Sequence, residues 1–468
     1  MSERPPDCQV LIAGGGPAGA ALALRLARLG CDVCVAEGQA FPRRHIGVSL
    51  APAAMPVLDQ IGVRDRLEAT RCCGSESTIV HWAGRTDILP HPPGQAGAQV
   101  DRGRFDQILL DEARRAGARL LQPARVVAAR RGRSHPWEVE IESGGRSRTV
   151  TTRFLAIAAG RRSALGGRRK RLSAPMLALH GFWKAGHAVS PQVRVEAAEN
   201  CWYWAAPLGD GTVAAAVFVD PQHLRGFSSL PEAFSHLLAA SRLIGPCVAG
   251  SPEAVEACSA TRDIIEPGAG RDFIRVGDAC FTVDPLSAQG VLHAIVSGLQ
   301  GAAVVNTILR RPQDGDAALS YFRARQQEAV ARDREIGGRY YRAQAAFASN
   351  GFWTGLAGEH VDAQRSRRSD PPPADVPLHL SARASLRSEP VIAGDYVSLA
   401  PALAHPELER PIAFVRNVPI AELTASLSGG AVLPVLMEQW AGRLPEREAR
   451  NLLATLWSRN VIEAAMGR

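Results

Sequence analysis

The sequence predicts an α/β protein with three parts: a domain built on a parallel sheet, an inserted β-rich domain, and a small helical C-terminal region. Its 468 residues exceed what one ordinary hydrophobic core holds. An apolar run, a glycine-rich turn and a helical stretch open the chain, whereas residues 175–220 show the alternation of strands. The proline-rich segment 365–376 is typical of a linker, and helical spacing follows it.

The first elements form a βαβ unit, because residues 8–13, 18–29 and 32–36 have the pattern of strand, helix and strand. The segment 104–118 carries its apolar residues on one helical face, and FLAIAAG at 154–160 is typical of a buried strand that ends at glycine. The other expected elements are strands within 120–159, 175–220 and 273–277, a helix from about Gly290 to Leu309, a long helix over 315–348, and tail helices over 420–427, 431–440 and 446–459.

These elements predict the domain boundaries. Residues 1–170 and 265–312 form the parallel-sheet domain, and 171–264 form the β-rich substrate domain. Residues 313–364 contain the long helix, and 365–468 contain the linker and the C-terminal helical domain.

Composition excludes several classes of protein. The formal net charge is +8, but the arginines that carry it are dispersed, and the dense run from Arg161 to Arg171 is typical of a solvated loop, so no nucleic-acid partner is expected. No apolar stretch of eighteen residues predicts a membrane span, and the N-terminus does not have the pattern of a secretory signal. The nine scattered cysteines, among them Cys31 and Cys34, favour reduced thiols in a cytoplasmic protein without a metal site.

A glycine motif follows the first strand. Gly14, Gly16 and Gly19, with Ala18 between them, form G-x-G-x-x-G in GGGPAG. The first glycine permits the tight turn, the second lets the backbone approach a pyrophosphate, and the third lets helix and strand pack closely. The helix start then offers free amides to phosphates, and Glu37 after the second strand is placed to accept a ribose hydrogen bond. This predicts a Rossmann-type dinucleotide site, without separating FAD from NAD.

Two distant segments indicate FAD. VDRGRFDQIL, with Arg102 and Phe105–Asp106, and VGDACFTVDPLSAQG at 276–290 resemble the superfamily of flavoprotein hydroxylases and flavin-dependent halogenases, over about residues 8–310. The resemblance implies a glutathione-reductase-like FAD domain in which Asp278 meets the ribityl chain. It further implies that Pro285 and the loop to Gly290 pass beside the isoalloxazine ring. Cofactor contacts are also implied for Arg44, Ser49 and Arg102. AIAAGR, with Ala158 and Ala159, departs from the family, which often has an acidic residue there.

The middle of the chain points to one branch of this superfamily. WYWAAP, from Trp202 to Pro207, resembles the tryptophan signature of halogenases, but residues 38–169 contain no lysine. Halogenases need a lysine after the first βαβ unit, and an arginine is a poor replacement because it stays protonated. Halogenation is therefore not expected. Trp202 and Trp204 lie on one face of a strand, either as core aromatics or as a wall of the flavin site.

The remaining pattern resembles the flavoprotein monooxygenases of tryptophylquinone cofactor biogenesis in quinohemoprotein amine dehydrogenases. It implies hydroxylation of a tryptophan ring through a flavin C4a-hydroperoxide, on a peptide or protein such as the small dehydrogenase subunit. The FAD would be reduced by NAD(P)H directly or through a separate flavin reductase. A reductase of isoprenoid lipids and a non-catalytic flavoprotein remain as alternatives.

Residues near the expected ring are candidates for catalysis. His293 lies on the first turn of the helix that begins near Gly290, and Asp284 and Gln289 belong to DPLSAQG. His45 and His81 are further candidates for proton transfer. Each histidine could equally be a structural residue.

Overall fold

The computed structural model describes residues 6–43, 45–70, 72–91, 97–132, 136–184, 192–248, 250–344, 347, 351–358 and 368–465. The chain divides into two compact units. The first consists of residues 1–311 and 322–360, and the second of residues 312–321 and 361–468.

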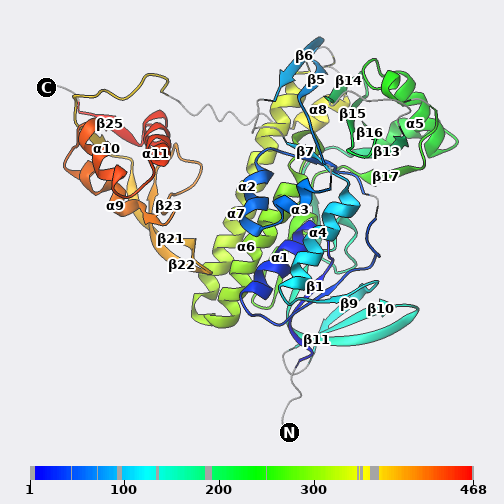
Figure 1. The fold of residues 1–468 in the computed structure, drawn as a ribbon, viewed down its shortest axis with the longest axis horizontal. Coiled ribbons are helices and arrows are strands. Elements are labelled where there is room, and N and C mark those ends of the chain that lie inside the picture. The colour runs from blue at the N-terminus through cyan, green and yellow to red at the C-terminus, as the bar shows by residue number, and fades with distance from the viewer. Residues whose placement is uncertain are drawn as a thin grey trace, which may run out of the picture. The chain divides into compact units, whose positions relative to one another are not determined.

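A parallel sheet forms the centre of the first unit (Figure 1). β1 (Cys8–Ala13) pairs in parallel with β2 (Val33–Ala36) and β11 (Arg146–Ile157), so that Val10 lies between Val33 and Phe154. β8 (Arg119–Leu121) and β19 (Phe273–Arg275) continue the parallel part. On the other side, β10 (Trp137–Ser143) pairs antiparallel with β11, and β9 (Arg125–Arg131) pairs antiparallel with β10. β1 is almost entirely apolar and buried, as expected for a parallel strand covered on both faces.

Three helices pack together beside this sheet (Figure 1). α1 (Pro17–Arg28) lies between α4 (Arg102–Arg115) and α6 (Gly290–Arg310). Gly298 permits the close approach of α1 and α6, because a Cβ at Gly298 would lie 2.4 Å from the carbonyl oxygen of Ala18. The tight packing thereby fixes the starts of α1 and α6 relative to each other.

A second sheet of seven strands carries the aromatic signature. α5 (Leu230–Ala239) packs on one face, with Phe234 among Leu179 and Tyr203. The other face packs against α8 (Gly351–Ala357) and the end of α7 (Gly315–Arg342). In spatial order the strands are β17 (Val255–Ser259), β13 (Leu177–Lys184), β16 (Thr212–Val219), β15 (Cys201–Pro207), β14 (Gln192–Ala197), β5 (Ser77–Trp82) and β6 (Arg85–Pro90).

Short elements connect the two sheets. β3 (Ser49–Leu50) and β4 (Cys73–Gly74) both pair with β7 (Ala98–Gln99), and β12 (Arg168–Arg171) pairs with β18 (Asp263–Glu266). Several short helical segments of this unit flank the elements above. They are α2 (Ala54–Ile61), α3 (Arg64–Glu68), and the 3-10 turns η4 (Gly277–Ala279) and η5 (Pro285–Ser287).

α6 has the length and composition of a membrane-spanning helix, although the sequence predicts no membrane span. However, 72% of its apolar window is buried inside the protein. A core helix of a globular protein has the same character, so this helix is weak support for a membrane span.

The second unit contains strands as well as the expected helices. Its core gathers Leu436, Trp440 and Leu456, and the Trp440 indole donates to the Leu423 carbonyl at 2.7 Å. The helices are α9 (Ile420–Thr424), α10 (Leu433–Ala441) and α11 (Glu446–Ser458). The strands form the pairs β20 (Leu378–Leu380) with β25 (Ile462–Ala464), β21 (Ser385–Ala393) with β22 (Tyr396–Ala404), and β23 (Phe414–Val415) with β24 (Val418–Pro419).

The predicted fold class is confirmed, with differences in detail. The β-rich sheet takes β5 and β6 from residues 77–90, which the sequence assigned to the parallel-sheet domain. The long helix ends at Arg342 rather than at residue 348. The hairpin of β21 and β22 was not predicted, because prolines interrupt the alternation of its strands.

Candidate functional site

Gly14 and Gly19 are required by the fold itself. Gly14 has φ +107°, and a Cβ there would lie 2.5 Å from the carbonyl oxygen of Ala158. A Cβ at Gly19 would clash with the carbonyl oxygen of Gly14. Neither position therefore accepts a side chain, as the turn between β1 and α1 predicts.

Gly16 and Gly290 are not required by the fold. A Cβ at Gly16 would meet, among the described residues, Arg43 Nη2 at 3.6 Å, and a Cβ at Gly290 would meet nothing within 4 Å. Gly16 is the N-cap of α1, Gly290 is the first residue of α6, and neither helix has a side-chain cap. Each helix start thus has room beside its glycine, and the first-turn amides and positive dipole end of a helix suit a pyrophosphate at α1 and an anionic ring edge at α6.

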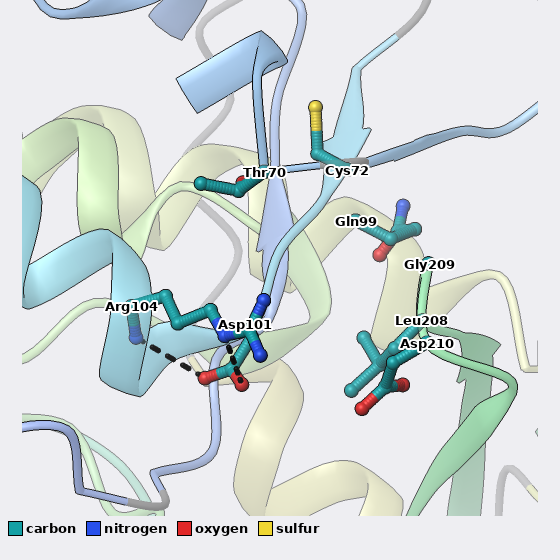
Figure 2. Close-up of a pocket in the computed structure, with 8 residues that line it drawn as sticks. All are labelled: Thr70, Cys72, Gln99, Asp101, Arg104, Leu208, Gly209 and Asp210. Atoms are coloured by element: carbon teal, nitrogen blue, oxygen red, sulfur yellow. Dashed lines mark hydrogen bonds and ion pairs between the residues drawn. The ribbon is translucent and has the colours of Figure 1, made fainter. Parts of the chain in front are cut away.

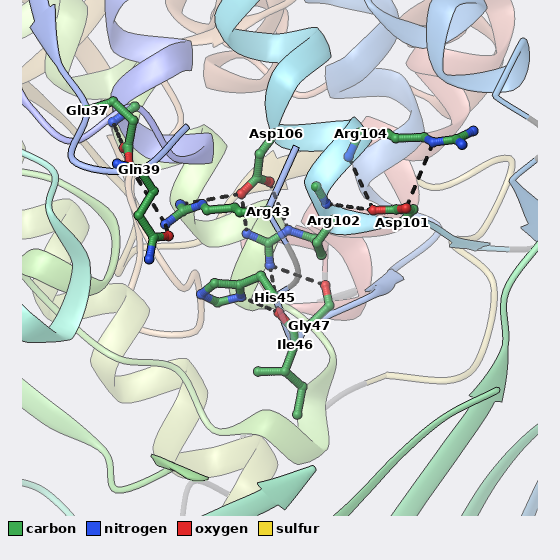
Figure 3. Close-up of polar contacts among 12 residues, drawn as sticks. Glu37, Gln39, Arg43, His45, Ile46, Gly47, Asp101, Arg102, Arg104 and Asp106 are labelled. Atoms are coloured by element: carbon green, nitrogen blue, oxygen red, sulfur yellow. Dashed lines mark hydrogen bonds and ion pairs between the residues drawn. The ribbon is translucent and has the colours of Figure 1, made fainter. Parts of the chain in front are cut away.

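Glu37 is buried beside the glycine turn (Figure 3). Its carboxylate accepts hydrogen bonds from the Gly15 amide at 2.7 Å and the Gln39 amide at 2.9 Å. Arg43 lies between Glu37 at 3.9 Å and Asp106 at 3.8 Å, and its buried Nε has no hydrogen-bond partner in the described part of the chain. A guanidinium Nε that lacks an acceptor, next to a helix start, is consistent with a phosphate ligand.

Arg102 holds the loop that precedes β3 (Figure 3). Its guanidinium pairs with buried Asp106 at 2.9 and 3.0 Å and donates to the Ile46 carbonyl at 3.0 Å. Ser49 at the end of this loop donates to the Gln99 side chain at 2.6 Å. The implied cofactor contacts of Arg102 and Ser49 thus belong to one ordered loop, whereas Arg44 lies outside the described residues.

A small pocket adjoins this loop (Figure 2). It has about 20 Å³ of solvent-accessible space, which is room for about one water molecule. The pocket is therefore too small for a flavin ring. Its lining residues are Thr70, Cys72, Gln99, Asp101, Arg104, Leu208, Gly209 and Asp210.

Asp278 lies on η4, directly before the segment that leads to α6. Its side chain is 32% exposed and accepts a 3.0 Å hydrogen bond from Arg161 Nε. Arg161 also donates to the Ser259 carbonyl on β17, so it connects Asp278 to the β-rich sheet. Arg161 follows the AIAAG segment that departs from the family pattern, and its pairing with Asp278 was not predicted.

His293 lies on the first turn of α6, as predicted. Its ring packs edge-on against Phe281 with centroids 5.4 Å apart, and Nε2 is buried without a hydrogen-bond partner in the described structure. Burial lowers the pKa of His293, although nearby Asp278 opposes the shift, so the ring is neutral at neutral pH. Gln289 precedes this turn, and its carbonyl accepts the His293 amide at 2.8 Å.

Asp284 faces into the protein behind the predicted flavin loop. Its backbone amide donates to Asp333 at 2.9 Å, and its carboxylate accepts from Tyr341 at 2.8 Å and from the Leu286 amide at 3.0 Å. Arg262 lies 3.6 Å from both carboxylates. Burial raises the pKa of Asp284, and it raises that of Asp333 to about 6. Asp284 therefore positions the Pro285–Gly290 loop through contacts on the interior side of that loop.

The two signature tryptophans lie on one face of β15, as alternation indicated. Trp202 is 1% exposed and stacks on Phe218 with centroids 3.7 Å apart and an interplanar angle of 8°. It is thus a core residue, whereas Trp204 is half-buried. Both pack in a cluster that also contacts Ile46 and Leu286, one from each of the two loops expected beside the flavin.

The structure brings together most of the residues that the sequence singled out. Gly14, Gly16, Ala18, Gly19 and Glu37 surround the start of α1, and Ala18 contacts η4, which leads toward α6. The residues that the sequence did not indicate are Arg43, Arg161, His180, Arg262 and Asp333. Their roles arise from contacts between distant segments, for which no local pattern exists. Among the described residues, no group of histidine, cysteine and acidic side chains could hold a metal.

The chain is similar to known flavoproteins. Residues 7–207 match the family described as FAD binding domain. Tryptophan 2-halogenase of Chondromyces crocatus is 29% identical over 407 residues, which cover 79% of this chain and 74% of the halogenase. The structure of the peptidyl tryptophan dihydroxylase QhpG, essential for tryptophylquinone cofactor biogenesis, aligns with a TM-score of 0.74 and 26% identity over 97% of this chain and 99% of that one.

The flavin-dependent halogenase CmlS shares the fold, with a TM-score of 0.77 and 20% identity over 100% of this chain and 99% of that one. The helix starts at Gly16 and Gly290, the Arg43 Nε without an acceptor and the partly exposed Asp278 carboxylate all fit an FAD. The chain is therefore similar in sequence and fold to flavin-dependent monooxygenases and halogenases, and it is an FAD-dependent oxidoreductase.

Proposed function

We propose that the protein is a monooxygenase that hydroxylates the indole ring of a tryptophan residue in a peptide or protein, during maturation of a tryptophylquinone cofactor. The observation that carries this proposal is the likeness to the peptidyl tryptophan dihydroxylase, because it extends over 97% of the chain at 26% identity and thus includes the C-terminal unit. The small subunit of an amine dehydrogenase is the protein substrate that this function implies.

Halogenation is the second candidate, since the tryptophan 2-halogenase is also a relative. It requires a lysine close to the substrate, but the two lysines of the chain, Lys170 on β12 and Lys184 on β13, are both exposed. A guanidinium stays protonated and is a poor nucleophile, so the arginines of this chain do not replace that lysine. Hydroxylation, which needs no such lysine, is the reaction that these residues support better.

Bound FAD, once reduced, supplies the electrons that activate dioxygen. One oxygen atom enters a C–H bond of the ring, and the other leaves as water with two protons and two electrons. The chain binds the cofactor at two helix starts and orders the loops beside it. The apolar face of the β-rich sheet excludes water from the site. Neutral His293, beside Asp278, is the group we assign to proton transfer at the start of α6.

The source of electrons is part of the proposal. NAD(P)H reduces the FAD directly or through a separate flavin reductase in the cytoplasm. Stopped-flow mixing of the FAD-loaded protein with NAD(P)H, with and without an added reductase, separates these routes. Rapid bleaching of the flavin with NAD(P)H alone identifies direct reduction.

The test of function is a product analysis. The FAD-loaded protein is reduced and mixed with oxygen-18 gas, chloride, bromide and a tryptophan-containing peptide of the partner subunit. A matched peptide with phenylalanine in place of tryptophan is the control. We expect oxygen-18 in the tryptophan peptide alone, by mass spectrometry. A halogenated peptide, or oxygen derived from water, would contradict the proposal.

A further inference from the structure

The β-rich sheet presents a row of three residues to the flavin side. The register places His180 of β13 beside Ala216 of β16, and Ala216 beside Trp204 of β15. Neighbouring strands lie about 4.8 Å apart, so the Cα atoms of His180 and Trp204 are on the order of 10 Å apart, with a methyl group between them. In the next row, Phe182 lies beside Ala214, and Ala214 lies beside Ala206 of β15.

This face adjoins the predicted cofactor site at three points. Val48, in the loop held by Arg102, packs on Ala214 together with Phe182 and Trp204. Leu286, in the loop after Asp284, packs in the cluster that contains Ala216. Arg161 ties Asp278 to the carbonyl of Ser259 at the end of β17, the edge strand next to His180. A ring bound on this face would thus lie beside the flavin.

His180 carries an unused acceptor at the closed end of this face. It is 5% exposed, and its Nδ1 is buried with no hydrogen-bond partner in the described part of the chain. Nε2 faces Glu256 at 3.9 Å, and this carboxylate favours the tautomer with the proton on Nε2. Burial lowers the pKa of His180, so Nδ1 is a neutral acceptor. A buried acceptor without a donor is unfavourable until a ligand supplies one.

We propose that His180 positions the substrate by accepting, at Nδ1, a hydrogen bond from the ring N–H of an indole that lies along Phe182 and Trp204. This assignment rests on the proposed function and identifies a residue that selects for the indole. Phe182 and Trp204 are half-buried, so the ring enters over them with its N–H leading toward His180. The alanines of these rows carry only a methyl group each, and the neighbouring aromatic rings favour stacking with a flat ring.

The test compares two variants on two substrates. His180→Asn keeps an acceptor at the position of Nδ1, whereas His180→Leu removes it at similar size. The substrates are a tryptophan peptide and the same peptide with 1-methyltryptophan, which cannot donate from the ring nitrogen. His236→Leu, on α5 against the opposite face of the same sheet, is the matched control. The measurements are peptide affinity by fluorescence, KM and kcat for oxygenation, and FAD affinity.

We expect the wild type and His180→Asn to prefer the tryptophan peptide by about tenfold or more. His180→Leu should bind both peptides alike, through a raised KM for the tryptophan peptide with FAD affinity unchanged. The assignment is overturned if the wild type binds both peptides with the same affinity. It is also overturned if His180→Leu still prefers the tryptophan peptide. If no peptide is oxygenated but the binding preference still depends on His180, the assignment holds and the proposed function fails.

Discussion

Replacement of Gly16 separates cofactor binding from folding. At φ −67° and ψ −176°, alanine is unstrained at this position, and its Cβ would contact Arg43 Nη2 at an ordinary 3.6 Å. We therefore expect Gly16→Ala to leave the stability of the apoprotein within about 0.5 kcal/mol of wild type. The methyl group would hold the pyrophosphate away from the amides, and loss of one charge-assisted hydrogen bond costs about 1.5–3 kcal/mol. The Kd for FAD should rise about 10- to 150-fold.

Gly19→Ala is the matched control, because its Cβ would clash with the Gly14 carbonyl and force α1 away from β1. Overpacking of this kind costs about 1–3 kcal/mol, so this variant should lose thermal stability as well as FAD binding. FAD titration by flavin fluorescence and thermal unfolding of the apoproteins measure both effects. An unchanged Kd in Gly16→Ala would refute the assignment of the pyrophosphate to the start of α1.

Three further outcomes follow from the structure. Burial raises the pKa of Asp333 from 3.8 to about 6, so folding disfavours its ionised form. The free energy of unfolding should therefore fall by roughly 3 kcal/mol as the pH rises from about 4 to 6, and Asp333→Asn should lessen this fall in urea unfolding. The same pH dependence in both proteins would contradict the effect of burial. Trp202→Ala should lower the free energy of unfolding by about 3–5 kcal/mol, and Trp204→Ala should lower it less because Trp204 is half-buried. Thermal unfolding measures both losses, and the reverse order would refute the core role of Trp202. Truncation at about Ser369 should preserve FAD binding, because the second unit has its own core. The truncated protein should no longer modify the protein substrate. Full activity of the truncated protein would exclude a role of the second unit in substrate recognition.

The cofactor turn was predictable because its constraints are local. Gly14 and Gly19 are fixed by clashes with backbone atoms a few residues away or on an adjacent strand, and Glu37 follows the next strand. Sequence spacing records such constraints directly. The alternation in WYWAAP likewise placed Trp202 and Trp204 on one face, although it left open whether they were core or wall.

Other parts of the site depend on contacts that no local pattern records. The Arg161–Asp278 pair joins residues 117 positions apart, and the cluster of Arg262, Asp284 and Asp333 joins three separate segments. His180 is an isolated histidine in an apolar strand, so its importance emerges from its neighbours on β16 and β17. Asp284 was expected near the ring, but its carboxylate is directed into the protein, toward Tyr341.

The most direct test of the account is a crystal structure of the protein with FAD. We predict one FAD per chain, with pyrophosphate oxygens within hydrogen-bond distance of the amides that begin α1, the ribityl hydroxyls at Asp278, and the edge of the ring in front of Gly290. The ring should face the row of His180, Ala216 and Trp204. An FAD bound elsewhere, or a ring on the far side of Pro285 from this sheet, would contradict the account.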